Sequence, residues 1–263
     1  MREERREIIL QELKKHGKIR VADLSKRFQC SEVTVRNDIR LMDKEGLLVR
    51  VHGGAVPAES AEQNPEPYKN CEMESLQRHA ERKRKIAACA YAFIKDRDTI
   101  IIDDASASYY LAEHIRNHPE KRVIVVTNSL PAGNILMTSD HVELFMVCGY
   151  VGGYAGGHLP ATLGDWAVRN IGQFHVDKAF IGVHGINFEV GFTSVATLQM
   201  EVKKAIIGAA KETYVLADSS KFGGGYLSVV CPLDAVRTVI TDDAISSEDL
   251  KQAENENLNL VIA

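Results

Sequence analysis

The stretch SEVTVRNDIRLMDKEGLLVRVHGGAV, residues 31–56, decides the fold of the amino-terminal part of this chain. Ser31 is a good helix N-cap, because its hydroxyl can accept a hydrogen bond from a free backbone amide in the first turn. At about 100° per residue, Val35, Ile39 and Met42 then fall on one narrow stripe. The pattern predicts a helix that buries this stripe and ends near the following glycine.

Two shorter helical patterns precede this helix, and a β-rich run follows it. Ile9 and Leu13 lie four residues apart in a pattern that a glycine ends, and residues 21–28 repeat apolar side chains at helical spacing. Residues 47–52 alternate well enough for a small β-wing. Three helices, with a tight turn before the third and a wing after it, predict a winged helix-turn-helix domain.

The outward arc of the third predicted helix carries side chains suited to base recognition. Arg can make a bidentate contact to guanine and Asn to adenine, and the methyl groups of Val or Thr can meet the thymine methyl. Basic side chains on the wing suit phosphates or a minor groove. For any single residue, a solvated helix face is the alternative. The candidate DNA-binding residues are Ser31, Val33, Thr34, Arg36, Asn37, Arg40, Arg50 and His52.

Charge is divided unevenly along the 263 residues, whose net charge is −4. Residues 1–56 hold 13 Lys or Arg against 9 Asp or Glu, whereas the remainder holds 19 against 27. A basic module attached to an acidic one suits a nucleic-acid reader carried by a domain that does not itself bind nucleic acid. Chance clustering of exposed charge is the alternative.

The composition of the chain also indicates in which cellular compartment the protein is located. No stretch approaches the about 20 uncharged apolar residues of a membrane span, and the opening MREERREIIL is charged where a signal peptide would be apolar. The five cysteines are scattered and include no CxxC pair, which predicts reduced thiols rather than disulfides. We therefore expect a cytoplasmic protein with no membrane partner.

A proline-containing polar stretch, residues 57–74, predicts an interdomain linker, because it cannot pack a core. We thus expect a DNA-binding domain at 1–56 and a larger domain at 75–263. The larger domain opens with an apolar helical pattern that carries a basic cluster at residues 82–85. We interpret that cluster as solvated helix surface, with proximity to DNA or to an anionic ligand as the less favoured alternative.

Short β-rich runs alternate with helical ones through the larger domain. This alternation predicts βαβ units and a mostly parallel, doubly wound α/β sheet. The ligand of such a sheet binds beyond the carboxyl ends of the strands. The runs are residues 99–103, 123–126, 143–148, 178–183, 214–216, 236–241 and 258–262.

Polar residues and glycines recur at successive predicted strand ends. The first strand leads into a helix that we expect to begin near Tyr109, so hydroxyls and amides would collect at its N-terminus. Asp103 and Asp104, as neighbours on an extended strand, should point to opposite faces. Turn chemistry alone explains any single position. The candidate effector-binding residues are Asp103, Ser106, Ala107, Ser108, Thr127, Asn128, Gly149, His184, Gly185, Asp218 and Lys221.

These motifs resemble a known family. Residues 5–56, with SEVTVRNDI followed by LLVRVHGGA, resemble the DeoR family of bacterial transcriptional regulators, with Asn37 at a position where Arg is common. Residues 75–260, with IIIDDASAS, VVTNSL, DKAFIGVHGINFEVGFTS and VLADSSKFG, are similar to the DeoR sensor domain. That domain is related in fold to ribose-5-phosphate isomerase. Residues 104–108 replace part of the usual Asp-Ser-Gly-Thr-Thr loop.

The resemblance implies a regulator that binds double-stranded operator DNA, acts as a repressor of a carbohydrate-metabolism operon and responds to a phosphorylated sugar. We expect a dimer or tetramer on half-sites about 10 bp or a multiple apart. One alternative is a regulator that answers to a non-phosphorylated ligand.

The other alternative is a sugar-phosphate isomerase that carries a DNA-binding module. Related isomerases use carboxylates where residues 184–187 here read His-Gly-Ile-Asn, so we expect binding without turnover, although His184 could act as a base. No GxxxxGK[ST], HExxH or GxSxG motif occurs. His114 and His118 have a metal-compatible spacing, but we interpret them as surface histidines at a helix end. We assign no catalytic residue, cofactor or metal.

Overall fold

The chain forms two compact units, Met1–Asn70 and Cys71–Ala263, in a computed structural model. Among the described residues, no helix is both long and apolar enough to cross a membrane. The structure describes residues 2–16, 19–28, 30, 32–44, 47–51, 54–57, 76–152, 159–195 and 197–263.

The amino-terminal unit is a winged helix-turn-helix, as predicted. Its strands are antiparallel, in the order β1-β3-β2, so the wing is a hairpin of β2 and β3 joined by one further short strand. The sequence patterns did not indicate β1, which has only two residues. The elements are α1 (Arg2–His16), β1 (Ile19–Arg20), α2 (Val21–Phe28), α3 (Glu32–Lys44), β2 (Leu48–Val51) and β3 (Gly54–Pro57).

The core of this unit forms where the apolar periodicity predicted it. Val35, Ile39 and Met42 of α3 are buried, and they share one cluster with Ile9 and Leu13 of α1. Spacing of three and four residues puts these side chains on one face of each helix. The buried stripe leaves the rest of the α3 circumference for contacts outside the unit.

The carboxy-terminal unit is built on a seven-stranded sheet in which neighbouring strands pair in parallel. Its order is β15-β14-β12-β9-β4-β5-β6. This arrangement confirms the predicted doubly wound α/β domain. The strands are β4 (Thr99–Ile102), β5 (Val123–Thr127), β6 (Val142–Met146), β9 (Val176–Ile181), β12 (Ala210–Leu216), β14 (Thr238–Thr241) and β15 (Leu260–Ile262).

All seven predicted strands exist, but their bounds differ. The largest shift is in β12, which begins at Ala210 rather than at residue 214, and β9 likewise begins earlier than predicted. Charged side chains interrupt the apolar pattern near the start of each of these two strands, so the pattern does not detect where the strand begins. Lys178 of β9, for example, is buried because its ammonium group donates to Asp98.

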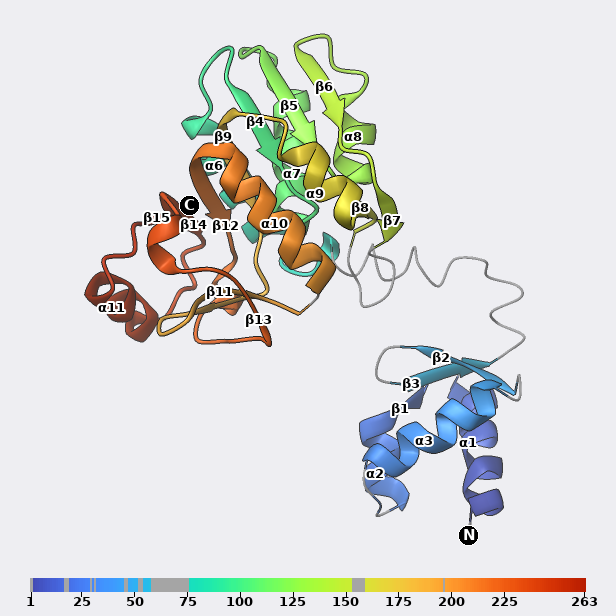
Figure 1. Cartoon of the computed structure of the whole chain (residues 1–263). Helices are drawn as coiled ribbons and strands as arrows, with labels where there is room; N and C mark the ends of the chain where they lie inside the picture. Colours follow the sequence, from blue (N-terminus) through green and yellow to red (C-terminus); the bar gives the residue numbers. More distant parts are fainter. Residues whose placement is uncertain are drawn as a thin grey trace. The chain divides into compact units, whose positions relative to one another are not determined.

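Helices cover both faces of this sheet (Figure 1), so the central strands are buried on both sides. Ile100 and Ile102 of β4 belong to one buried cluster with residues of α6, α7 and α8, whereas Ile101 belongs to another with residues of α9, α10 and α11. The alternation follows from the two-residue period of a strand. The helices are α6 (Ala80–Phe93), α7 (Ser106–Asn117), α8 (Leu130–Leu136), α9 (Asp165–Ile171), α10 (Thr197–Ala209) and α11 (Ser247–Asn255), with short 3₁₀ turns η1 (Ser219–Lys221) and η2 (Leu233–Ala235).

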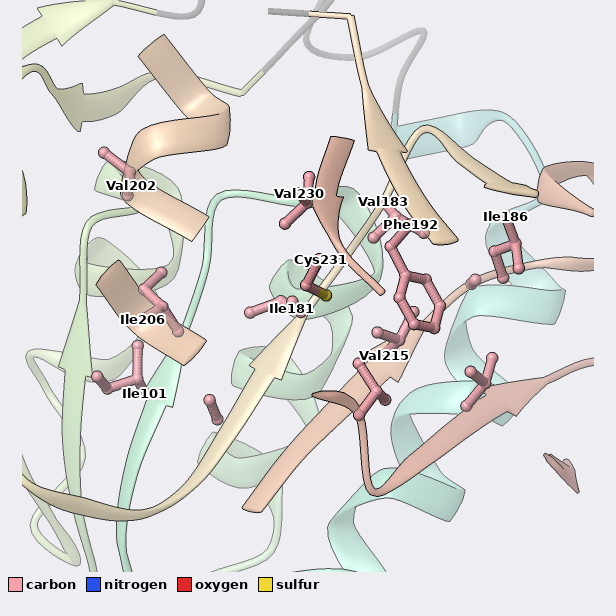
Figure 2. Close-up of a cluster of buried hydrophobic side chains, with 14 of the residues drawn as sticks. Ile101, Ile181, Val183, Ile186, Phe192, Val202, Ile206, Val215, Val230 and Cys231 are labelled. Carbon is pink, nitrogen blue, oxygen red and sulfur yellow. The ribbon is translucent and has the colours of Figure 1, made fainter. Parts of the chain in front are cut away.

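Figure 2 shows the cluster on the α10 face of the sheet. Val202 and Ile206 of α10 pack in it with Ile101 of β4 and Ile181 of β9. This apolar contact fixes α10 across the two central strands. It thereby sets where the polar side chains of the first turns of α10 lie.

The direction of strand addition reverses between β4 and β9. From β4 the chain proceeds through β5 to β6 at one edge, and from β9 it proceeds through β12, β14 and β15 to the other. Such a reversal leaves the crevice at which doubly wound sheets bind ligands, beyond the carboxyl ends of the two strands. Two small antiparallel sheets complete the unit, formed by β7 (Tyr150–Gly152) and β8 (Ala161–Leu163), and by β10 (Gly185–Asn187), β11 (Gly191–Ser194) and β13 (Ser228–Cys231).

Candidate functional site

The third helix of the amino-terminal unit presents part of the predicted DNA-reading face. Asn37 is exposed and Thr34 is half-buried. The assignment of both to DNA stays a prediction. Ser31 and His52 lie outside the described residues, as do the side chains of Val33, Arg36, Arg40 and Arg50.

An ion pair attaches α3 to α1. Arg5 Nε donates to Asp38 Oδ2 at 2.6 Å, and Asp38 is only 2% exposed. Sequence patterns missed this contact because the two residues are 33 positions apart. A buried charge pair with a hydrogen bond holds the two helices in one register.

At the carboxyl edge of the large sheet, the loops after β4 and β9 touch each other. The amide of Gly182 donates to Asp103 Oδ2 at 2.9 Å. A Cβ atom at position 182 would lie far inside van der Waals contact with Cβ of Ala105. Only glycine therefore lets the two loops approach this closely.

Lys203 of α10 lies at the switch point, the place between β4 and β9 at which the direction of strand addition reverses. Its ammonium group, 2% exposed, donates to Asp103 and lies 3.6 Å from Asp104 Oδ1. Burial alone would lower the pKa of Lys203, but the two carboxylates outweigh burial and raise it. The prediction that Asp103 and Asp104 point to opposite faces is wrong. The strand ends at Ile102, so strand alternation no longer applies to them.

The helix that follows β4 begins at Ser106, not near Tyr109 as predicted. Ser108 is therefore inside the first turn, fully buried, and its hydroxyl donates to Asp103. Ala107 is buried as well, and Ser106 is half-buried. The hydroxyl of Ser108 is thus committed to the protein in this conformation, and its role toward an effector stays a prediction.

The end of β5 supplies a second polar loop. The hydroxyl of Thr127 donates to the carbonyl of Ile102 at 2.6 Å, which links β5 to β4. The side-chain amide of Asn128 donates to the carbonyl of Thr162 at 3.2 Å, and its Oδ1 has no hydrogen-bond partner among the described residues. Asn128 therefore keeps an acceptor that a ligand hydroxyl could use.

The remaining predicted positions lie at the ends of β6 and β9. Gly149 is exposed, and a Cβ there would lie 2.8 Å from the carbonyl oxygen of Leu163, so glycine is required by the approach of β8. His184 is half-buried, and its Nδ1 shares a hydrogen bond with the Ser194 hydroxyl at 3.2 Å. Gly185 is the first residue of β10 and packs equally closely, against Gly224.

A cationic cluster lies where β12 ends. Lys83 of α6, only 5% exposed, is influenced by Asp218 and by the positive charges of Lys221 and Arg78. Burial, together with Lys221 and Arg78, lowers the pKa of Lys83 to about 8, although Asp218 opposes this. Burial would raise the pKa of Asp218, but hydrogen bonds from Ser220 and the charge of Lys221 lower it. Two cations and one carboxylate therefore act on the ammonium group of Lys83.

Arg82 fixes the same end of α6 to the loop after β12. Its Nη1 donates to Ser219 Oγ at 3.1 Å, and its Nε lies 3.7 Å from Asp242 Oδ1. Asp242 in turn accepts from the amide of Ser219 at 2.7 Å. The interpretation of residues 82–85 as solvated surface is therefore wrong for Lys83 and for part of Arg82. An apolar pattern could not show that α6 starts beside a distant loop.

The histidine pair of α7 lies away from these loops, at the end of its helix. The rings of His114 and His118 stack with their centroids 3.8 Å apart. Within the described ranges, no group of three His, Cys, Asp or Glu side chains could hold a metal ion.

Two family comparisons match this chain. Residues 5–61 match the DeoR-like helix-turn-helix domain, and residues 78–243 match the DeoR C terminal sensor domain. The first match contains the predicted DNA-reading face. The second contains the carboxyl-edge loops from Lys83 to Lys221.

Similar proteins align along nearly the whole chain. A relative from Escherichia coli O157:H7, provisionally named as the transcriptional repressor of the aga operon, is 30% identical over 98% of this chain and 93% of its own. The lactose phosphotransferase system repressor of Lactococcus lactis is 29% identical over 94% of each chain. The HTH-type transcriptional regulator IolR of Bacillus subtilis is 28% identical over 94% of each chain.

Solved structures match part of this chain. Ribose 5-phosphate isomerase A of Methanocaldococcus jannaschii matches 53% of each chain at 21% identity, with a TM-score of 0.37. Translation initiation factor eIF-2B of Pyrococcus horikoshii matches 64% of each chain at 21% identity, with a TM-score of 0.42.

Proposed function

Because this chain belongs to the DeoR family of transcriptional regulators, we propose that it is a repressor of a carbohydrate-metabolism operon whose operator binding responds to a phosphorylated sugar. The winged helix-turn-helix binds double-stranded operator DNA, with the exposed arc of α3 in the major groove. The names of two relatives, which refer to the aga operon and to a lactose phosphotransferase system, support carbohydrate control.

The observation that carries the proposal is the cationic cluster of Lys83, Lys221 and Arg78 at the carboxyl edge. Burial lowers the pKa of Lys83, and the positive charges of Lys221 and Arg78 lower it further, so a positive charge is disfavoured here. A phosphate dianion would stabilise that positive charge and would gain charge-assisted hydrogen bonds. The effector phosphate therefore binds here, with Lys221 and the hydroxyl of Ser219, which accepts from Arg82 and keeps its own proton to donate. The hydroxyls of Ser108 and Ser220 are both committed to aspartates.

The sugar part of the effector lies along the neighbouring loops, toward the switch point between β4 and β9. Asn128 offers an acceptor oxygen, and His184 offers a ring that can donate or accept according to its tautomer. Ser106 and Gly185 contribute hydroxyl and backbone groups at the same edge. A polyol with several hydroxyls suits such a mixture of donors and acceptors.

Effector binding reaches the DNA-binding unit through α6. Lys83 and Arg82 lie in the first two turns of α6, the helix that follows the predicted linker at residues 57–74. An anion at this helix end changes the charge balance at the start of α6. The effector must bind the DNA-bound and free states differently to change operator affinity.

The assembly we propose is a homodimer or tetramer in the cytoplasm. One helix-turn-helix makes few base contacts, so two copies on half-sites about 10 bp or a multiple apart supply the affinity. The carboxy-terminal unit carries large exposed apolar side chains, among them Trp166 and Tyr150. Such side chains suit contacts between copies.

We further propose that the sensor domain binds its ligand without turnover. A general base for aldose–ketose interconversion needs a free, positioned group. Asp103 and Asp104 are both held by Lys203, so neither carboxylate is free for that task. Incubation with pentose and hexose phosphates should give no interconversion; turnover that His184→Ala abolishes would show an enzyme instead.

The test of the proposed function has two steps. Thermal unfolding of the full chain is followed with a panel of sugar phosphates, the matching free sugars and nucleotides, because a ligand that prefers the folded state raises the Tm. A duplex selected from a random library by the protein is then titrated with and without the stabilising compound. Stabilisation by one sugar phosphate, together with weakened duplex binding, is the expected result. Stabilisation by free sugars alone would contradict the phosphate assignment.

A further inference from the structure

A buried amide on α10 is the starting point. Gln199 lies in the first turn of α10 and is 4% exposed. Its Nε2 donates to Asp104 Oδ2 at 2.8 Å. Gln199 therefore contacts the loop that follows β4, at its second residue.

Asp104 fixes which way round this amide lies. An ionised carboxylate accepts hydrogen bonds and cannot donate them. Asp104 forms a salt bridge with the ammonium group of Lys203, which lies 3.6 Å from its Oδ1. A flipped amide would place Oε1 of Gln199 against a carboxylate oxygen, which is repulsive. Nε2 therefore faces Asp104, and Oε1 occupies the opposite side of the amide.

The oxygen end of the same amide is left without a partner. Oε1 of Gln199 is buried and accepts no hydrogen bond from any described residue. Buried acceptors almost always have a partner, so an orphaned one needs an explanation. Asp104 holds the Nε2 end of this side chain, and the Oε1 end has no donor. Oε1 can therefore accept a hydrogen bond from a ligand.

The position of this oxygen matches the ligand crevice. Gln199 contacts the loop after β4, and β4 and β9 form the switch point at which doubly wound sheets bind their ligands. Val202 and Ile206 of α10 pack in one cluster with Ile101 of β4 and Ile181 of β9 (Figure 2). The amide of Gln199 therefore belongs to a packed helix and lies beside the loop at the carboxyl end of β4.

We infer that Oε1 of Gln199 accepts a hydrogen bond from one hydroxyl of the bound sugar, which makes Gln199 a specificity-determining residue of the sensor domain. This inference rests on the proposed function. It deepens that function by requiring a hydroxyl donor on the ligand at the point that Gln199 contacts. A deoxy sugar phosphate or a ligand with only acceptors at that point would leave the buried oxygen unpaired.

The expected discrimination is large because the acceptor is buried. A site built to hydrogen-bond a hydroxyl rejects the analogue that lacks it more strongly than an apolar pocket rejects a smaller group. Fluorine in place of that hydroxyl keeps the size of the group but cannot donate. We expect one monofluorinated position to weaken binding about tenfold or more, as loss of a buried hydrogen bond does.

The experiment is a cycle of ligand and side-chain changes on the full chain. The sugar phosphate that most raises the Tm is titrated by calorimetry together with its monodeoxy and monodeoxyfluoro derivatives. The same titrations are repeated on Gln199→Met, which removes Oε1 at similar volume, and on Gln252→Met, a matched change at an exposed glutamine of α11. For each protein we take the dissociation constant of the analogue divided by that of the parent sugar phosphate. Comparing this ratio between the wild-type protein and Gln199→Met isolates the contribution of the contact between Gln199 and the ligand hydroxyl.

The inference predicts that one analogue is about tenfold weaker on the wild-type protein and on Gln252→Met, and that this ratio falls to about one on Gln199→Met. An unchanged ratio on Gln199→Met overturns the inference while the proposed function stands. If Gln199→Met does not fold, the wild-type series decides: equal binding of every analogue overturns the inference. If no sugar phosphate binds the wild-type protein, both the inference and the proposed function are overturned.

Discussion

Two buried lysines at the carboxyl edge of one sheet have opposite surroundings. Lys203 faces the carboxylates of Asp103 and Asp104, and these outweigh burial and raise its pKa. Lys83 faces Asp218 but also Lys221 and Arg78, and its pKa is lowered to about 8. Both side chains are almost fully inaccessible to solvent. Both lysines are therefore buried to a similar degree, and their pKa values shift in opposite directions because the nearby charges differ.

The comparison separates a structural lysine from one that is suited to a ligand. Lys203 has its counter-charges within the protein, so it stabilises the switch point and has no need of an anion. Lys83 is held at a cost to folding, and an anionic ligand would offset that cost. Perturbed pKa values of this second kind gather at functional sites more often than elsewhere. Four changes test whether this distinction holds.

The largest effect is expected from Lys203→Met, which leaves two carboxylates buried without a counter-charge. Breaking a buried charge cluster by removing one partner lowers the free energy of unfolding by about 3 to 5 kcal/mol. Urea denaturation measures the loss. Lys204→Met is the matched control, because its side chain is 45% exposed and pairs with Glu201 at 3.5 Å. An equal loss in both variants would mean that the buried cluster contributes no more to the free energy of unfolding than an exposed ion pair does.

A smaller loss of stability is expected from Gly182→Ala. The new methyl group would collide with Ala105 and displace the Asp103 loop that Lys203 closes. Overpacking of this kind costs about 1 to 3 kcal/mol. Gly208→Ala in α10 is the control: its added methyl group meets nothing within 4 Å and should stabilise the helix by up to about 1 kcal/mol. Stabilisation by both changes would rule out the close approach.

Lys83→Met should act in two opposite directions. Removing an ammonium whose pKa burial lowers should raise the free energy of unfolding of the free protein by on the order of 1 kcal/mol. The same change should weaken binding of the sugar phosphate about tenfold, as loss of a charge-assisted hydrogen bond does. Calorimetric titration and thermal unfolding give the two numbers, with Lys85→Met at an exposed position as control. Lower stability with unchanged ligand affinity would make Lys83 structural, like Lys203.

The smallest effect is the pH dependence that Lys83 confers. Its pKa is about 8, so the ammonium is charged below that pH and neutral above it. Ligand affinity should be nearly fully present at about pH 7 and below and should fall about tenfold between about pH 7 and pH 9, because only the charged form attracts phosphate. The fall should not exceed the loss caused by Lys83→Met and should vanish in that variant. An affinity that rises with pH would contradict the assignment.

Local periodicity made the fold predictable. The stripe of Val35, Ile39 and Met42 requires only a helix, and the triple isoleucine of β4 requires only a strand buried on both faces. Each pattern is read within a few residues, and each was confirmed. The starts of β9 and β12 were misplaced because charged residues interrupt the apolar pattern there.

The candidate site was less predictable because its charges meet across the fold. Asp103 and Asp104 were identified as polar residues at a strand end, but Lys203 lies 100 residues beyond Asp103 and nothing in its helix marks it. The basic run at residues 82–85 was interpreted as solvated surface for the same reason. Its partners, near Asp218, come into contact with it only when the sheet forms. A signal does exist in hindsight: a lysine three residues before Ile86 lies on the buried face of α6.

The most direct test of the account is ligand-induced stabilisation of the wild-type protein and of Lys83→Met by one sugar phosphate and its matching free sugar. The account predicts that the sugar phosphate raises the Tm of the wild-type protein well above the effect of the free sugar, and that Lys83→Met loses this difference. Equal stabilisation by both compounds, or a phosphate-specific rise that persists in Lys83→Met, would contradict the claim that Lys83 marks the effector's phosphate.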